Sequence, residues 1–146
     1  MTQGILILCT GNICRSPMAE VLIRSLLGES VSVSSAGVSA LVGRPADPLA
    51  VAVCSEHALD LTGHKAKQVD RSMLGAHGLV LVMEAGHKDW LMRRFPEARG
   101  SVYLLGHCLS GVEIPDPYGE SRAAFVESLE LIRRCAEAWM PRLRKL

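Results

Sequence analysis

The sequence predicts an α/β fold in three layers (α/β/α), with a four-stranded parallel sheet between two layers of helices. Short apolar runs of strand length alternate with longer amphipathic segments along the chain. This alternating order of strands and helices is typical of a parallel sheet with helices on both faces. The 146 residues contain no internal repeat or long linker, so we expect a single domain over residues 1–146.

The first half of the chain is expected to supply two of the four strands. Its first apolar run is continuous, and its second segment alternates apolar and polar side chains, as half-buried strands do. Asp47-Pro48 is typical of a helix start, with Asp47 as N-cap and proline in the first turn. The expected order is a strand at 5–9, a helix at about 17–28, a strand at 31–34, a loop at 36–46 and a helix from Asp47 to about Leu59.

The second half is expected to supply the other two strands. Residues 79–83 are apolar without interruption, which indicates a strand buried on both faces. The helix that follows has to stop before Pro96, since proline cannot continue a helix. The expected order is a short helix at 70–76, a strand at 79–83, a helix at 86–95, a strand at 102–105, a loop containing Pro115 and Pro117, and a long amphipathic helix at 121–140.

Composition and charge exclude several classes of function. The net charge of +1 gives no reason to expect binding to nucleic acid. No apolar run approaches the roughly 20 residues that span a bilayer, and Met1-Thr2-Gln3-Gly4 lacks the basic region of an export signal, so we expect a cytoplasmic protein without membrane insertion. The five cysteines are odd in number and fit no zinc-site spacing. Cys54 and Cys135 fall within expected helices and are expected in the core.

The most informative motif covers residues 9–16 and reads Cys-Thr-Gly-Asn-Ile-Cys-Arg-Ser. Because it follows a strand and opens a helix, its backbone N–H groups and the positive end of the helix dipole face one small space, which suits an anion. A thiol under such a loop ionises readily and becomes a nucleophile. We expect Cys9 to attack phosphorus while the planar guanidinium of Arg15 holds two phosphate oxygens. The other residues expected to bind phosphate are Thr10, Gly11, Asn12, Ile13, Cys14 and Ser16.

Two residues of this motif have expected local roles. Gly11 is expected to let the backbone turn so that successive N–H groups face inward. Ser16 is expected to be the N-cap of the helix that Pro17 opens, and its hydroxyl could steady a thiolate. Since Arg15 and the backbone N–H groups already supply positive charge, neither a metal ion nor a cofactor is expected.

Transfer of a phosphoryl group onto sulfur leaves behind an oxygen that needs a proton, and two Asp-Pro pairs compete for the role of proton donor. A carboxylic acid near the leaving oxygen contributes roughly 10²–10⁴ in rate. The position of Asp47 before a helix is explained by capping, whereas Asp116 lies in a loop ahead of the last helix. Pro117 biases Asp116 toward an extended backbone. We therefore expect Asp116 to be the acid, at the same sheet edge as Cys9.

The run from Cys9 to Pro17 resembles the phosphate loop of the low-molecular-weight protein tyrosine phosphatases. The likeness continues in the same order over nearly the whole chain. The further segments that carry it are Ser34-Ser35-Ala36-Gly37, His64-Lys65-Ala66-Lys67-Gln68-Val69, Val82-Met83-Glu84 and Asp116-Pro117-Tyr118-Gly119. Residues 96–100 and 114–118 are most similar to bacterial members encoded with tyrosine kinases of polysaccharide export.

This resemblance implies a metal-independent hydrolase that forms a cysteinyl-phosphate on Cys9, with Asp116 first as acid and then as the base that activates water. The residues implied to hold the loop in shape through hydrogen bonds are Asn12, Ser16, Ser35 and His64. A reversible disulfide between Cys9 and Cys14 is also implied. The implied substrate is phosphotyrosine in a cytoplasmic tyrosine kinase of capsule or exopolysaccharide export, and the oligomeric state stays open.

Leu41 and Tyr118 are expected to form walls of the cleft above the nucleophile. Tyr118 can stack on the flat ring of a substrate. Leu41 stands where eukaryotic relatives carry Trp, and Gly119 stands in place of a second aromatic residue. The cleft is therefore expected to be more aliphatic and more open than in those relatives.

Three other functions share parts of this pattern. Arsenate reductases of this fold relay a disulfide through two further cysteines, and residues 80–95 contain none. Protein-arginine phosphatases carry Thr where this chain has Ile13, and an apolar side chain there favours an aromatic ester over a guanidinium. Phosphate carriers of similar fold lack the arginine of the loop, so Arg15 together with Asp116 favours hydrolysis.

Overall fold

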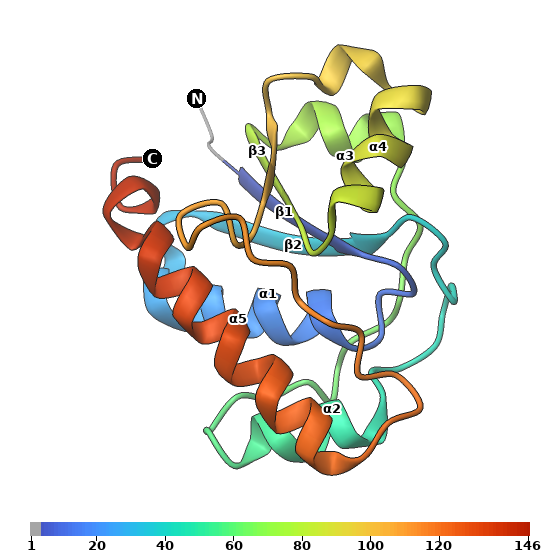
Figure 1. Ribbon diagram of the computed structural model, residues 1–146, viewed down its shortest axis with the longest axis vertical. Helices are drawn as coiled ribbons and strands as arrows, with labels where there is room; N and C mark the ends of the chain where they lie inside the picture. The colour runs from blue at the N-terminus through green and yellow to red at the C-terminus, as the bar shows by residue number, and fades with distance from the viewer. Residues whose placement is uncertain (1–3) are drawn as a thin grey trace.

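Four parallel strands in the order β2-β1-β3-β4 form the central sheet of the computed structural model, which describes residues 4–146 (Figure 1). The strands are β1 (Gly4–Cys9), β2 (Ser32–Gly37), β3 (Leu79–Val82) and β4 (Val102–Leu104). The helices are α1 (Arg15–Leu27), α2 (Pro48–Ser55), α3 (Arg71–Ala76), α4 (Ala85–Arg94) and α5 (Arg122–Leu143), with 3-10 turns η1 (Gly28–Ser30) and η2 (Pro96–Ala98). The predicted α/β class and parallel sheet are confirmed.

Helices cover both faces of the sheet. In Figure 1, α1, α2 and α5 lie on one side, and α3 and α4 lie on the other. Side chains of β1 alternate between the two faces: Ile5 and Ile7 belong to the apolar cluster with α1 and α5, while Leu6 and Leu8 belong to the cluster on the other face. All four are fully buried. This double burial fixes β1, and with it the position of Cys9 at its carboxyl end.

The predicted elements are all present, but several boundaries differ. Helix α2 ends at Ser55 rather than near Leu59, because the chain turns at Ala58, whose φ of 60° is left-handed and cannot continue the helix. Asp47 is its N-cap, as predicted, and accepts a hydrogen bond from the Leu49 N–H at 2.9 Å. Helix α5 continues past Pro141 to Leu143, since a proline so near the end removes little of the helical hydrogen bonding.

Strand β2 extends to Gly37, two residues into the predicted loop, and the chain beyond it runs along the start of the Cys9 loop. The N–H groups of Val38 and Ser39 donate to the carbonyls of Cys9 and Thr10 at 3.0 and 2.9 Å. A Cβ at Gly37 would lie only 2.5 Å from the Thr10 carbonyl oxygen. Glycine is therefore required there by the close approach of the two backbones.

Within residues 4–146, no helix is both long enough and apolar enough to cross a membrane. Met1-Thr2-Gln3, on which the expectation about an export signal partly rests, lies outside the described residues.

Candidate active site

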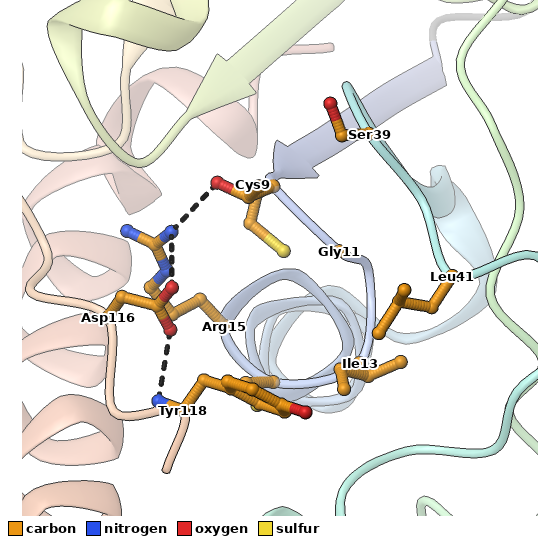
Figure 2. Close-up of a pocket in the computed structure, with 10 residues that line it drawn as sticks. Cys9, Gly11, Ile13, Arg15, Ser39, Leu41, Asp116 and Tyr118 are labelled. Atoms are coloured by element: carbon orange, nitrogen blue, oxygen red, sulfur yellow. Dashed lines mark hydrogen bonds and ion pairs between the residues drawn. The ribbon is translucent and has the colours of Figure 1, made fainter. Parts of the chain in front are cut away.

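The segment between β1 and α1 forms a tight loop over the N-terminal end of α1. Cys9 is the last residue of β1 and Arg15 is the first residue of α1, so the two flank the loop. Figure 2 looks along α1 and shows the Cys9 sulfur pointing into the space between Asp116 and Tyr118 on one side and Leu41 and Ile13 on the other. The N–H groups at the start of a helix lack partners within the helix, so this end of α1 suits an anion.

The turn in the loop occurs at Asn12, not at Gly11 as the sequence suggested. Asn12 has a φ of 59°, in the left-handed region, whereas Gly11 is not among the residues with positive φ in the described chain. A Cβ at Gly11 would make only ordinary contacts, the nearest at 3.7 Å from Leu41. Asparagine tolerates this backbone better than most residues because its side chain can hydrogen-bond locally.

Hydrogen bonds from three parts of the chain hold Asn12 in this conformation. Its amide nitrogen donates to the hydroxyls of Ser16 at 2.8 Å and Ser35 at 3.0 Å, and its amide oxygen accepts from the Lys67 N–H at 3.0 Å. His64 Nε2 donates to the Asn12 carbonyl at 2.6 Å. Asn12 is fully buried. The four residues that the resemblance groups around the loop therefore lie together in space.

Ser16 contacts the candidate nucleophile directly. Its Oγ lies 2.9 Å from Cys9 Sγ, and it accepts a hydrogen bond from Asn12. Since that contact uses an oxygen lone pair, the hydroxyl hydrogen can go either to a Cys9 thiolate or to the Ala36 carbonyl at 3.4 Å. The prediction that Ser16 is the N-cap of α1 is wrong: the helix already begins at Arg15, with Cys14 as N-cap, and the Ser16 side chain turns into the loop instead.

Arg15 is 1% exposed and is held by groups from distant parts of the chain. Its Nη1 donates to the Glu84 carboxylate and, at 2.8 Å, to the Ile114 carbonyl. Its Nη2 lies 3.4 Å from Thr10 Oγ1 and 3.6 Å from Asp116 Oδ2. The guanidinium is thus locked by partners on one side and faces the loop and Asp116 on the other.

Asp116 and Tyr118 lie in the loop between β4 and α5, on the wall of the cleft facing Leu41 (Figure 2). The Asp116 side chain is 46% exposed, so it can exchange protons with solvent or a bound molecule. Its Oδ1 accepts a hydrogen bond from the Tyr118 N–H at 3.1 Å, while Oδ2 points toward Arg15. The loop thereby brings a carboxyl group to the same sheet edge as Cys9.

These side chains enclose a cleft of about 260 Å³. Its lining residues are Cys9, Thr10, Gly11, Ile13, Cys14, Arg15, Ser39, Leu41, Asp116 and Tyr118. All except Ser39 were named from the sequence. Leu41 and Tyr118 stand at the rim, 37% and 55% exposed, and Cys9 lies at the bottom, 2% exposed.

Sequence reasoning missed two side chains that support the site from the start of α4. Glu84 binds the guanidinium of Arg15, and His87 lies 3.0 Å from Thr10 Oγ1 through its Nε2. Burial, more than any other cause, lowers the pKa of His87 below its usual 6.5, and the cation of Arg15 lowers it further. The available signal was that Glu84 follows the end of β3, the sheet edge where ligands of such folds bind.

Burial disfavours ionisation of three other cysteines. Burial raises the pKa of Cys54 to about 12 and that of Cys135 to about 11, and both are fully buried, as predicted. Burial, with added repulsion from Asp47 and Asp116, also raises the pKa of Cys14. All five cysteines are unpaired, so the Cys9–Cys14 disulfide stays a prediction.

Comparisons with known proteins agree with this fold and site. The chain belongs to the family described as low molecular weight phosphotyrosine protein phosphatase, which matches residues 4–146. It is 46% identical, over its full length and 99% of the relative, to a probable low molecular weight protein-tyrosine-phosphatase EpsP of Ralstonia nicotianae. Wzb of Vibrio vulnificus, solved with benzylphosphonate, superposes with a TM-score of 0.93 at 39% identity, covering 97% of this chain and 99% of that one. The YwlE arginine phosphatase of Geobacillus stearothermophilus superposes with a TM-score of 0.91 at 32% identity, covering 98% and 94%.

The contacts of Asn12 predict a measurable difference between two substitutions. Asn12→Ala removes the buried side-chain hydrogen bonds and keeps a Cβ in the left-handed region, so we expect a loss of about 2–4 kcal/mol in the free energy of unfolding. Asn12→Gly loses the same hydrogen bonds but relieves the backbone strain, so it should be about 1 kcal/mol more stable than the alanine variant. Denaturant titration measures both, and equal stabilities would contradict the strained conformation.

Proposed function

We propose that this chain hydrolyses phosphotyrosine in a protein substrate, with Cys9 as nucleophile, Arg15 as the phosphate-binding cation and Asp116 as the proton donor. The observation that carries the proposal is that these three side chains, from β1, α1 and the loop before α5, line one cleft. Membership of the phosphatase family supports the same conclusion.

In the first step, the Cys9 thiolate attacks phosphorus from the bottom of the cleft. The S–P bond forms as the bond from phosphorus to the phenolic oxygen breaks, and Asp116 gives its proton to that oxygen. Negative charge on the three remaining phosphate oxygens is met by the guanidinium of Arg15 and the loop N–H groups. Because Arg15 is already fixed by Glu84 and the Ile114 carbonyl, it needs little reorganisation to do this.

In the second step, water attacks the cysteinyl-phosphate and the S–P bond breaks. Asp116, now a carboxylate, takes a proton from the water, which leaves phosphate and a free thiolate. The hydroxyl of Ser16, 2.9 Å from Cys9 Sγ, can donate to the sulfur as negative charge returns to it. This contact supports Cys9 as a leaving group as well as a nucleophile.

The shape of the cleft supports an aromatic phosphoester. Cys9 is almost fully buried, and only a long side chain can bring phosphorus to it from the protein surface. Ile13 and Leu41 on one wall and Tyr118 on the other present apolar and aromatic surface to a flat ring (Figure 2). Phosphoserine is too short to use these walls and the sulfur at the same time.

We further propose a tyrosine kinase of capsule or exopolysaccharide export as the substrate, and a cytoplasmic location with it. The support is the resemblance of residues 96–100 and 114–118 to bacterial members encoded with such kinases. The high identity to the relative named EpsP points the same way. Residues 1–146 would form a single catalytic domain that needs neither metal nor cofactor.

Substitution of Asp116 by asparagine tests the proton donor. Asp116→Asn should slow hydrolysis of a phosphotyrosine peptide by about 10²–10⁴. The loss should be much smaller for an aryl phosphate whose phenol is strongly acidic, since such a phenolate leaves without a proton. Asp47→Asn is the matched control: asparagine also caps helices well, so this variant should keep its activity. Equal losses on both substrates would contradict the role of Asp116 as acid.

A comparison of three phosphopeptides tests the substrate class. With peptides of equal sequence carrying phosphotyrosine, phosphoserine or phosphoarginine, we expect kcat/KM to be highest for phosphotyrosine because of the apolar walls at Ile13 and Leu41. Since the fold is also that of an arginine phosphatase, a preference for phosphoarginine is the result that would overturn this reading.

A further inference from the structure

A buried histidine that the mechanism above does not use contacts the phosphate loop. His87 is the third residue of α4 and is only 6% exposed. Its Nε2 lies 3.0 Å from the hydroxyl oxygen of Thr10, which lines the cleft. The two residues are separated by 77 positions in the sequence, so the contact exists only in the folded chain.

The surroundings of His87 determine which ring nitrogen carries hydrogen. The backbone N–H of Glu84 points at Nδ1 at 3.2 Å. A backbone N–H can only donate, so Nδ1 must offer a lone pair. In a neutral imidazole the hydrogen is then on Nε2, and Nε2 donates it to Thr10 Oγ1.

This arrangement determines what the Thr10 hydroxyl can do. The hydroxyl oxygen has two lone pairs: one accepts from His87 Nε2, and the other faces Arg15 Nη2 at 3.4 Å, which also can only donate. The hydroxyl hydrogen is therefore left to point elsewhere, and in residues 4–146 Thr10 Oγ1 donates to no protein acceptor. An anion in the cleft would supply one.

We propose that His87 is a positioning residue, which orients the Thr10 hydroxyl so that it donates a hydrogen bond to the phosphoryl group held by the loop. The inference rests on the proposed function, since it adds a side-chain donor to the same phosphate site. Thr10 then contributes through its hydroxyl in addition to its backbone N–H. His87 itself touches neither phosphorus nor the leaving group.

The charges around His87 agree with a neutral ring. Burial is the main cause that lowers its pKa, followed by the Arg15 guanidinium, and the carboxylates of Glu84, Asp116 and Glu113 oppose the shift. If Nδ1 also carried a proton, two N–H donors, that of Nδ1 and that of the Glu84 backbone, would face each other, which is unfavourable. The positioning of Thr10 therefore depends on an uncharged His87.

Paired substitutions separate this role from a structural one. Thr10→Val removes the hydroxyl at nearly constant shape and should lower kcat/KM for p-nitrophenyl phosphate about tenfold, the worth of one hydrogen bond to a charged group. Thr10→Ser keeps the hydroxyl and should retain most of the activity.

His87→Asn can still accept from the Glu84 N–H, but its side chain is too short to reach Thr10, so it should lose about as much kcat/KM as Thr10→Val. His87→Gln can reach Thr10 with an amide N–H and should recover part of the loss.

The double variant gives the decisive comparison. If His87 acts through Thr10, then Thr10→Val combined with His87→Asn should be no worse than Thr10→Val alone. The proposal would be overturned if the double variant showed the product of the two single losses in kcat/KM, or if Thr10→Val alone kept the wild-type kcat/KM. Absence of turnover in the wild type would instead count against the proposed function. Should His87→Asn fail to fold, His87→Gln takes its place: combined with Thr10→Val it should be no worse than Thr10→Val alone.

Stability as a function of pH tests the neutral state of His87. Its pKa is about 6.5 in the unfolded chain and lower in the folded one, so the unfolded chain binds more protons below pH 6.5. The free energy of unfolding should therefore fall as the pH drops from 7 to 5. His87→Gln removes the titrating group at this position and keeps the other histidines, so its decline should be shallower, and equal slopes for the two proteins would contradict a neutral His87.

Discussion

The site depends on one backbone constraint: Asn12 is held in a left-handed conformation inside the phosphate loop. This conformation turns the chain so tightly that Cys9, at the end of β1, and Arg15, at the start of α1, face one cleft. The conformation is unfavourable for a residue with a Cβ, so other contacts have to stabilise it. The hydroxyls of Ser16 and Ser35, the Lys67 N–H and His64 provide those contacts, so residues far along the chain determine the shape of the loop.

The second requirement of the site is that the buried guanidinium of Arg15 be stabilised by protein groups and still remain free to bind an anion. An unpaired guanidinium at 1% exposure would be costly, and Glu84 together with the Ile114 carbonyl offsets that cost for Arg15. Both contacts use Nη1, which leaves Nη2 toward Thr10 and Asp116. Nη1 of Arg15 is therefore paired with protein groups that anchor the side chain, while Nη2 stays available on the side where phosphate would bind.

Much of this site could be predicted from the sequence because the loop is contiguous. Cys9, Arg15 and the residues between them follow a strand and open a helix, and that local pattern implies an anion site. Asp116 could be chosen over Asp47 because only Asp47 directly precedes a helix. By contrast, Glu84 and His87 act through contacts that span 69 and 77 positions, and no spacing rule reveals such contacts.

The wrong predictions have a common physical cause. Ser16 followed by proline looks like an N-cap, and a glycine in a tight loop looks like its turning point. In the folded chain, tertiary hydrogen bonds override both local preferences: they draw the Ser16 hydroxyl toward Cys9 and Asn12, and they stabilise the turn at Asn12 instead of Gly11. Helix α2 ends early, at Ser55, and the left-handed φ of Ala58 three residues later has no signal in the sequence, which carries neither glycine nor proline there.

The central claim is that a phosphoryl group passes through the sulfur of Cys9. It is tested most directly by quenching turnover of a phosphotyrosine peptide with denaturant and locating the phosphoryl group by fragmentation in a mass spectrometer. We expect one phosphoryl group on Cys9 and none on Cys14, and no turnover in Cys9→Ser. A phosphoryl group on another residue, or hydrolysis by Cys9→Ser at the wild-type rate, would contradict the account.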